Sequence, residues 1–577
     1  MRRILNGAVR KGRLAPLLRV SRPVALVEPH FGLNQTPFAK LARSMTLLAA
    51  PPPAVHSRRV TLISRVRGSA RPLSDWLLAL GSSFLLILAF PDFELWPLSA
   101  VALVPLLFVV AQRPKPWRSF FLGWLTGTVF FYGSCYWLTY SMIHYGGVPT
   151  AFAYLLLVPV PLVVGLFPGM FALLLARAIK RWGTAALLTA VVIWPATEWA
   201  RLGITGQLWN ALGYSLAYKP SLIQSASWGG VYAVSCLLVA VNAALAFLIV
   251  RRTLKAVLIA AGILGAVVLI IVPSLQSPQI RPVADPNASD VVALQPNVPM
   301  ALVKSTAEMQ ALMDRHVSMT EEALNSLPQS TKTRLVIWPE SPMNFGYSTD
   351  TQLRELLLNF ATKHKASILF NSQEPAPNDG IYNSALFVND QGKLIAQYDK
   401  IRLMPFGEYV PLPHWLPGSN LITAIVGDFT PGTRFTLMPV GEARVGVFIC
   451  IESAYPYITR GLTREGADVL INISNDGYLG PTAVRRQHLA NAIFRAVEND
   501  RDVMRVTNSG ITAYITSDGE VRDATESFST AVRIWRIGSR SNAQTFYSRH
   551  GDVFVAACAL LSLVLFASTF RLRSKPR

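Results

Sequence analysis

The sequence predicts a polytopic α-helical membrane domain joined to an extracytoplasmic α/β domain. Of the 577 residues, 51% are apolar and only 15% are charged, whereas about a quarter are charged in a typical globular domain. Apolar runs of membrane length dominate the chain before residue 275, and short β-rich runs alternate with helical stretches after it. This composition excludes a disordered chain and a nucleic-acid-coating protein, despite the net charge of +21.

Much of the positive charge lies at the N-terminus. Residues 1–72 hold twelve Arg and two Lys against one acid, Glu28. Their composition resembles that of a transit peptide. We expect residues 1–72 to be a disordered cytoplasmic extension, or the product of a start codon assigned too early, with Met45 as the later start.

The apolar runs predict about eight membrane spans, because a span needs about 20 mostly apolar residues. From residue 76 to residue 274 the only acids are Asp92, Glu94 and Glu198. Seven spans form a predicted membrane domain at residues 73–274, and an eighth forms a C-terminal helix at residues 553–570. The runs are Trp76–Phe90, Leu98–Ala111, Phe120–Tyr140, Ala151–Ala176, Thr184–Ala200, Ala226–Val250, Ala256–Val272 and Val553–Phe570.

The loops predict the orientation of these spans, because Lys and Arg are retained on the cytoplasmic side. Basic connections at residues 113–118, 177–181 and 251–255 alternate with base-poor connections. Both termini are therefore predicted to be cytoplasmic. The segment between the seventh and eighth spans is predicted to be extracytoplasmic.

That segment opens with a Pro-rich linker at residues 275–288 and continues as a predicted α/β domain at residues 289–540. Alternating strands and helices are typical of a layered α/β fold. The predicted strands are Val291–Gln295, Leu335–Trp338, Ser367–Asn371, Ala385–Val388, Val445–Ile449, Val469–Ile473 and Val503–Thr507. The predicted helices are Thr306–Leu327, Thr351–His364 and Thr482–Asn499.

Cys450 is the one thiol of the α/β domain, since the other three cysteines fall inside apolar runs. It follows the apolar run 445–449, at the end of a strand, where α/β folds gather their active sites. A buried core cysteine is the alternative. Four cysteines are too few for a disulfide scaffold and lack metal-type spacing, and no HExxH, P-loop or CxxC motif occurs. We therefore expect no metal and no cofactor.

Two further residues favour a nucleophilic role for Cys450. Glu340 follows an apolar strand ended by Pro339, and Lys400 precedes the Pro/Gly-bounded loop 405–411. A cysteine nucleophile needs a base to accept its proton and a positive group to stabilise the oxyanion. Glu340, Lys400 and Cys450 supply these three roles.

In this order, the three residues resemble the Glu-Lys-Cys triad of the nitrilase (carbon–nitrogen hydrolase) superfamily. With seven spans before the domain and one after it, the chain from about Trp76 resembles the apolipoprotein N-acyltransferase family. Ile451 and Val303–Lys304 depart from that family, which commonly has aromatic residues there. The matching motifs are Leu294–Asn297, Pro405–Pro411, Ile473–Tyr478, Gln487–His488, Arg495–Glu498, Arg505–Gly510, Glu198–Trp199 and Trp209–Ser215.

This resemblance implies an αββα sandwich and a ping-pong acyl transfer in a bacterial inner membrane, with the α/β domain on the periplasmic side. Glu340 would act as base, Lys400 would stabilise the oxyanion, and Cys450 would carry the acyl group as a thioester. Glu408 and Glu452 would support them. The implied donor is a phospholipid of the bilayer, and the implied acceptor is the α-amino group of an S-diacylglyceryl-cysteine at the N-terminus of an apolipoprotein. We expect a monomer that binds no nucleic acid.

Four more residues are substrate-binding candidates: Trp209, Tyr214, Asn475 and Asp476. The alternatives are aromatic residues of the membrane interface for Trp209 and Tyr214, and a buried polar network at strand ends for Asn475 and Asp476, together with Arg495 and Glu498. His488 is expected to be structural. Glu198 is a functional candidate as an acid within the membrane part.

Two rival functions remain open from sequence. The first is a membrane-tethered amidase or nitrilase that hydrolyses a small amide; seven preceding spans, where one anchor would do, argue against it. The second is a non-enzymatic scaffold with a degenerate hydrolase domain, and the intact triad argues against that.

Overall fold

The computed structural model describes residues 57–272, 288–300, 305–328, 332–340, 342–405, 407–410, 429–540 and 543–570. Contacts divide the chain into two units, Met1–Val66 and Arg67–Arg577, and the second unit is described below. Of the predicted extension, residues 1–56 lie outside the described residues. The helix α1 (Ser57–Ala89) begins before the first predicted span, so it includes residues 57–72 of the predicted extension.

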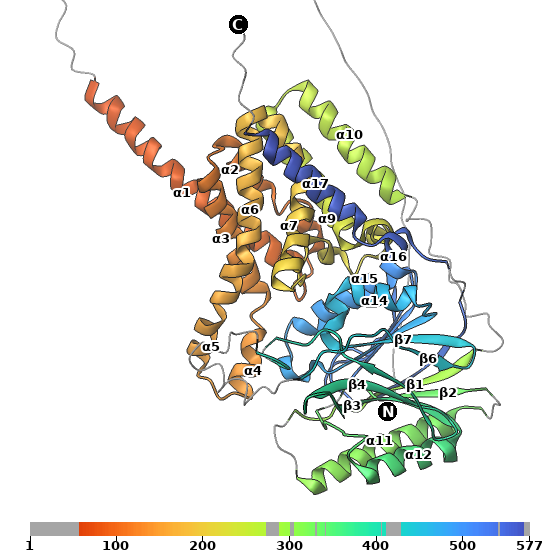
Figure 1. The fold of residues 1–577 in the computed structure, drawn as a ribbon. Coiled ribbons are helices and arrows are strands. Elements are labelled where there is room, and N and C mark those ends of the chain that lie inside the picture. Colours follow the sequence, from red (N-terminus) through yellow and green to blue (C-terminus); the bar gives the residue numbers. More distant parts are fainter. Residues whose placement is uncertain are drawn as a thin grey trace, which may run out of the picture. The chain divides into compact units, whose positions relative to one another are not determined.

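The first part of the second unit is helical throughout (Figure 1). Its elements after α1 are η1 (Trp96–Ala100), α2 (Val104–Gln112), α3 (Pro116–Ser134), α4 (Leu138–His144), α5 (Thr150–Leu157), α6 (Pro159–Trp182), η2 (Thr184–Thr189), α7 (Ala190–Thr205), η3 (Leu212–Leu216), α8 (Pro220–Ile223), α9 (Ala226–Arg251) and α10 (Leu254–Ile271). The chain returns to this part with α17 (Val553–Ser568).

Three helical segments are long and apolar enough to cross a membrane: Thr150–Trp182, Ala226–Arg251 and Leu254–Ile271. Three shorter apolar segments are Leu73–Ala89, Trp96–Gln112 and Val553–Ser568. At least four predicted spans are not single α-helices. The runs 98–111 and 184–200 begin in the 3₁₀ turns η1 and η2, the run 120–140 is broken between α3 and α4, and the run 151–176 is divided between α5 and α6. The count of eight spans therefore stays a prediction.

The helices α3 and α6 pack unusually closely. A Cβ atom added at Gly127 would lie 2.7 Å from the Cγ of Pro168, and one at Gly123 would lie 2.3 Å from the Pro168 carbonyl oxygen. Small residues at such positions let helix backbones approach, which increases dispersion contacts where water provides no driving force.

The α/β domain contains two six-stranded sheets. The first has the order β12-β1-β2-β3-β4-β5, and the second has the order β11-β10-β9-β8-β7-β6. Their strands are β1 (Ser289–Gln295), β2 (Arg334–Ile337), β3 (Ala366–Pro375), β4 (Ile381–Val388), β5 (Leu394–Asp399), β6 (Leu437–Val440), β7 (Ala443–Ile449), β8 (Val469–Ser474), β9 (Val503–Thr507), β10 (Ala513–Ile515), β11 (Val521–Arg522) and β12 (Ala531–Ile537).

Both sheets have a parallel centre and antiparallel edges. β1, β2 and β3 are parallel neighbours, as are β7, β8 and β9. The carboxyl ends of parallel strands share one edge of a sheet, and ligands of α/β folds bind at that edge. All seven predicted strands coincide with observed ones, whereas β5, β6, β10, β11 and β12 were not predicted.

Side chains alternate between two faces of each sheet and so build three apolar layers. The first sheet covers its outer face with α11 (Thr306–Ser326) and α12 (Thr351–His364). The facing sides of the two sheets form a second layer with Val291, Val447 and Ile471. The outer face of the second sheet packs against α14 (Pro456–Arg464) and α15 (Val484–Asn499). This is an αββα sandwich (Figure 1).

The third layer continues without a break into the helical part. One apolar cluster contains Phe448 of β7, Ile493 of α15 and Val231 of α9. The helices α14 and α15 therefore bury both faces, one against the sheet and one against the helical part. The remaining short elements are η5 (Cys450–Ala454), η6 (Asp476–Leu479) and α16 (Phe546–His550).

Gln487 is the polar centre of this junction. Its side chain is 2% exposed and uses every hydrogen-bonding position of the amide. The Oε1 atom accepts hydrogen bonds from Trp209 Nε1 at 2.8 Å and Trp137 Nε1 at 3.0 Å. The Nε2 group donates to the carbonyl oxygens of Ser134 and Pro91, both at 3.0 Å. One residue of α15 thus joins four places in the helical part.

We predict that Gln487→Ala lowers the free energy of unfolding by at least about 2 kcal/mol, because buried donors and acceptors lose their partners. The thermal unfolding midpoint of the detergent-solubilised full chain measures this change. Gln391→Ala, in the exposed turn before β5, is the matched control. Equal midpoints for the two variants would contradict the prediction.

Candidate active site

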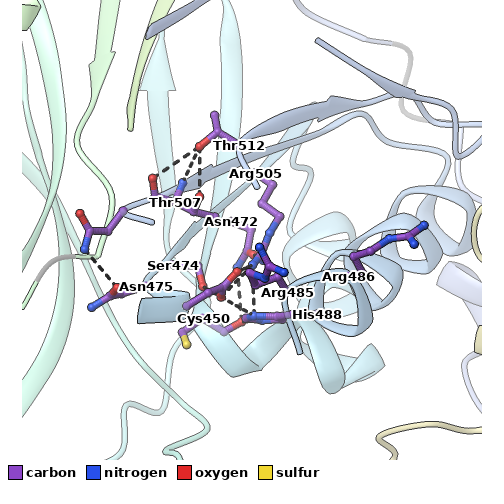
Figure 2. Close-up of polar contacts among 12 residues, drawn as sticks. Cys450, Asn472, Ser474, Asn475, Arg485, Arg486, His488, Arg505, Thr507 and Thr512 are labelled. Carbon is purple, nitrogen blue, oxygen red and sulfur yellow. Dashed lines mark hydrogen bonds and ion pairs between the residues drawn. The ribbon is translucent and has the colours of Figure 1, made fainter. Parts of the chain in front are cut away.

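Cys450 lies at the end of β7, where the chain turns sharply into η5. Its φ angle is +50°, a left-handed value that is uncommon for residues other than glycine. Such a conformation persists only when neighbouring groups hold it in place. Figure 2 shows the sulfur directed away from the polar residues that surround the Cys450 backbone.

Those residues hold the carbonyl oxygen of Cys450. The Nε2 atom of His488 lies 2.9 Å from this oxygen, and Asn472 donates to it at 3.5 Å (Figure 2). The other ring nitrogen of His488 lies 2.8 Å from Asp476 Oδ1, and Arg505 donates to Asp476 Oδ2 at 2.7 Å. The backbone of Cys450 therefore rests on a buried chain of hydrogen bonds.

This arrangement gives Asp476 a supporting position. Its side chain is buried, and although burial raises its pKa, Arg505 and His488 outweigh burial and hold the pKa below its ordinary value. Asp476 is ionised and already paired, as the buried-network interpretation expects. The structure places it beneath the Cys450 turn and gives it no open face for a substrate.

Lys400 follows β5 and is 1% exposed. Its Nζ atom lies 2.8 Å from Glu408 Oε1 and 3.5 Å from Glu340 Oε1. Burial lowers the pKa of Lys400, but the charges of Glu408 and Glu340 outweigh it and hold the pKa above its ordinary value. Lys400 is therefore an ammonium group in a dry site, where its charge acts more strongly than in water.

Asn383 connects the two carboxylates. Its Nδ2 group donates to Glu340 Oε1 at 3.1 Å and to Glu408 Oε1 at 2.6 Å. Asn371 in turn donates to Asn383 Oδ1 at 2.7 Å, which fixes the amide orientation. Glu408 also accepts the backbone N–H of Met404 at 2.7 Å. Residues of β3, β4 and the loop after β5 thus hold both carboxylates against Lys400.

Glu340 and Cys450 are electrostatically coupled. The pKa of the Cys450 thiol is raised first by burial and then by Glu340, and Lys400 opposes the rise. The resting thiol is therefore protonated at neutral pH. Nucleophilic attack then requires a proton acceptor in the same step, and Glu340 is the carboxylate whose charge most affects this thiol.

Glu452 joins the Cys450 turn to the end of β5. Its fully buried carboxylate accepts hydrogen bonds from the backbone N–H groups of Ile401 and Ile449, both at 2.7 Å, and from Tyr398 Oη at 2.9 Å. Burial raises the pKa of Glu452 to about 7 against these donors. Its contacts make it a positioning residue that fixes Lys400 relative to Cys450.

Asn475 contacts the site through its backbone. Its N–H donates to Glu340 Oε2 at 3.1 Å, and its side chain binds Gly477, Asn508 and Met300. The side-chain contacts are those of a structural residue, and the direct contact with Glu340 comes from the peptide group.

Trp209 and Tyr214 do not form a belt at a membrane surface, contrary to that alternative. Both are buried, at 6% and 3% exposure, between the helical part and α15. Trp209 donates to Gln487, and its ring centroid lies 5.7 Å from that of His488. Tyr214 accepts a hydrogen bond from Arg495 at 3.2 Å. Their proposed contact with substrate stays a prediction.

Sequence patterns missed Asn383, and they noted Tyr478 only as the last residue of the motif Ile473–Tyr478. Asn383 precedes the apolar run that predicted β4, and no local pattern distinguishes it. Tyr478 is 42% exposed, and its pKa is raised to about 12 by burial and by the charges of Glu340 and Glu408. It therefore lies at the open side of the site. The hydroxyl group of Ser141, in α4, donates a hydrogen bond to the carbonyl oxygen of Tyr478 at 2.6 Å.

The described residues contain no group of three His, Cys, Asp or Glu side chains that could hold a metal ion. The polar groups around Cys450 are instead paired with one another. What the arrangement offers chemically is a thiol, a carboxylate and a buried ammonium group.

Comparisons with known proteins extend over most of the chain. Residues 82–244 match the apolipoprotein N-acyltransferase N-terminal domain, and residues 290–539 match the carbon-nitrogen hydrolase domain. The apolipoprotein N-acyltransferase of Geobacter metallireducens is 31% identical over 515 residues, which cover 88% of this chain and 97% of that protein. The chain belongs to the apolipoprotein N-acyltransferase family. The resemblance predicted from sequence motifs is thereby confirmed.

Other members of the apolipoprotein N-acyltransferase family give similar matches. The protein of Allorhizobium ampelinum is 31% identical over 477 residues, covering 78% of this chain and 88% of its own. The protein of Thermotoga maritima is 28% identical over 528 residues, which cover 87% of this chain and 95% of that protein. Among solved structures, an amidase from Nesterenkonia sp. covers 47% of this chain and 95% of its own, with 12% identity and a TM-score of 0.33.

Of the two departures from the family pattern, Ile451 is 6% exposed and belongs to the apolar cluster of the junction. An apolar residue fits that position. Val303 and Lys304 lie outside the described residues.

We predict that Glu452→Gln destabilises the protein by about 2–4 kcal/mol, although the two side chains have the same shape. Each carboxylate oxygen of Glu452 accepts from a backbone N–H, that of Ile401 on Oε1 and that of Ile449 on Oε2, so an amide NH₂ would oppose a donor in either orientation. Chemical or thermal unfolding of the solubilised chain measures the change. Glu355→Gln, on the exposed side of α12, is the control, and equal effects of the two substitutions would refute this role.

We predict opposite effects of two substitutions on alkylation of Cys450 by iodoacetamide, which reacts with thiolate. The raised pKa makes the wild-type rate at pH 7 slower than that of a free cysteine, and the rate should climb as pH rises. Glu340→Gln removes a charge that raises the pKa and should speed alkylation at pH 7, whereas Lys400→Met should slow it. Mass spectrometry of the Cys450 peptide follows the rates. Iodoacetamide reacts with thiolate that has already formed, so this rate reports the effect of the Glu340 charge on the thiol pKa and not proton transfer during attack on an ester. A slower Glu340→Gln reaction would contradict the charge assignment.

Proposed function

We propose that this protein transfers an acyl chain from a membrane phospholipid to the α-amino group of an S-diacylglyceryl-cysteine at the N-terminus of apolipoproteins. The observation that carries the proposal is the buried Lys400 ammonium group between Glu340 and Glu408, at the turn that presents Cys450. Membership of the apolipoprotein N-acyltransferase family supports the choice of acyl acceptor.

In the first half-reaction, Glu340 accepts the proton of the Cys450 thiol while sulfur attacks the ester carbonyl carbon. The carbonyl oxygen becomes an oxyanion, which Lys400 stabilises. When the C–O bond of the ester breaks, the glycerol oxygen takes the proton from Glu340 and lysophospholipid leaves. The acyl group remains on Cys450 as a thioester.

In the second half-reaction, Glu340 is ionised again and acts as base toward the incoming amine. The amine nitrogen attacks the thioester carbon, and Lys400 stabilises the second oxyanion. The C–S bond breaks, sulfur recovers a proton through Glu340, and an amide remains on the acceptor. The thioester conserves the acyl group between the two steps, so the reaction consumes no nucleotide.

Glu408 and Glu452 have supporting roles in this mechanism. Glu408 helps to keep Lys400 charged and oriented through its 2.8 Å contact. Glu452 fixes the backbone on both sides of the site. Trp209, Tyr214, Asn475 and Asp476 contribute through the positions of the loops that they hold, since none of the four is exposed.

The helical part suits this reaction because both substrates keep their hydrocarbon chains in a bilayer. We propose about eight spans in residues 73–274 and 553–570, in a bacterial inner membrane. Both termini would be cytoplasmic and residues 289–540 periplasmic, as the distribution of Lys and Arg favours. We propose that the protein acts as a monomer.

The proposal predicts that incubation with phospholipid adds one acyl mass to the purified full chain, because the thioester accumulates when no amine is present. Intact-mass analysis detects the addition, and Cys450→Ala should abolish it. Adding a diacylated lipopeptide with a free α-amino group should return the protein to its original mass and yield a triacylated peptide. Glu355→Gln, remote from the site, should load acyl like the wild type.

Two outcomes would contradict the proposal. Failure of wild-type protein to gain acyl mass from any phospholipid would overturn thioester formation. Release of free fatty acid at the same rate with and without lipopeptide would favour a hydrolase over a transferase.

A further inference from the structure

Arg402 presents a charged group beside the candidate active site. Its side chain is exposed, and its Nε atom donates a hydrogen bond to Tyr457 Oη. The guanidinium carbon lies 5.3 Å from the ring centroid of Tyr457 and 5.5 Å from that of Tyr455. The faces of aromatic rings attract and orient such a cation. Two rings thus hold Arg402 in place and leave its outer N–H groups free of these contacts.

The pairing of Arg402 differs from that of several arginines in the α/β domain. Among the described residues, Arg402 forms no ion pair with a carboxylate, and its recorded partners are tyrosines. Arg460 instead pairs with Asp552 at 2.9 Å, Arg495 with Glu498 at 2.7 Å and Arg505 with Asp476 at 2.7 Å. A fixed cation without an acidic partner is suited to an anion from outside the chain.

The backbone places Arg402 close to the reacting groups. Arg402 follows Lys400 by two residues, a reach of at most about 7 Å. Its backbone N–H donates to Glu452 Oε1 at 3.1 Å, and Glu452 also binds the N–H of Ile449 next to Cys450. The ring partners lie just beyond η5, the turn that begins at Cys450. A ligand bound to Arg402 is therefore within a few residues of the nucleophile.

The same cluster touches the end of a helix in the helical part. Gln207, which follows α7, donates to Tyr455 Oη at 3.4 Å. Ile204, at the end of α7, is 77% exposed. Apolar side chains exposed next to Tyr and Arg are typical of the level where a bilayer meets water. Lipid headgroups lie at that level.

We propose that Arg402, with Tyr457 and Tyr455, binds the phosphate group of the phospholipid that donates the acyl chain. This inference rests on the proposed function and adds a headgroup subsite to it. A guanidinium group presents parallel N–H donors that match two phosphate oxygens. In a glycerophospholipid the phosphate is joined to the esterified glycerol, so binding it places the ester carbonyl near Cys450. Recognition of phosphate also explains a cation to which the described part of the chain gives no carboxylate partner.

The test compares acyl loading of Cys450 from two donors in the same detergent: a phospholipid, and a diacylglycerol with identical acyl chains but no phosphate. We expect Arg402→Gln to lower kcat/KM for loading from phospholipid about 10- to 100-fold. Loading from diacylglycerol should fall less than three-fold. Arg402→Lys, which keeps the charge but loses the paired donors, should lie between wild type and Arg402→Gln. Arg354→Gln on α12 is the control for the loss of one arginine.

Three results would overturn the subsite while leaving the proposed function intact. The first is equal acyl loading of wild type and Arg402→Gln from phospholipid. The second is an equal loss of loading from both donors in Arg402→Gln. The third is equal inhibition of loading from both donors by inorganic phosphate at matched ionic strength. The last result would indicate a general anion site. If wild type gains no acyl mass from either donor, the proposed function itself fails, which is a distinguishable outcome.

Discussion

The candidate site depends on keeping one ammonium group charged where water does not reach. Lys400 is 1% exposed, and burial of an unpaired ammonium group costs several kcal/mol. Glu340 and Glu408 offset that cost, and Asn383 holds both carboxylates toward Lys400. In the proposed mechanism this ammonium group would stabilise the oxyanion, and Glu340 is the carboxylate whose charge most affects the thiol.

The position of Cys450 depends on a second constraint, its left-handed backbone conformation. Neighbouring groups must stabilise such a backbone conformation. His488 of α15 and Asn472 of β8 do so by contacting the carbonyl oxygen of Cys450. His488, which contacts the Cys450 carbonyl, follows Gln487, which binds four groups of the helical part. The helical part and Cys450 are therefore contacted by adjacent residues of one helix, α15. This connection gives the helices a part in the geometry of the site as well as in reaching lipid.

Much of the α/β domain could be predicted from its sequence. The apolar runs Leu335–Trp338 and Val445–Ile449 predicted β2 and β7, because buried parallel strands are continuously apolar. The unpredicted strands β10 and β11 are three and two residues long, too short to show a period. The membrane spans were harder to predict, because hydropathy does not show where an apolar run stops being a continuous helix. One such interruption lies at Cys135, between α3 and α4. Asn383 and Arg402 escaped notice because each gains its meaning from residues distant in the chain.

The sequence by itself determined the family, the order of the domains and the identity of Glu340, Lys400 and Cys450 as candidates, because motifs and apolar runs are local. Only the tertiary structure decided what surrounds them. It showed that Trp209 and Tyr214 are buried against α15, that Asp476 is paired beneath the nucleophile, and that Arg402 is held by two tyrosines. Pairing and burial depend on contacts between segments hundreds of residues apart, such as Trp209 with Gln487, and no local pattern encodes them.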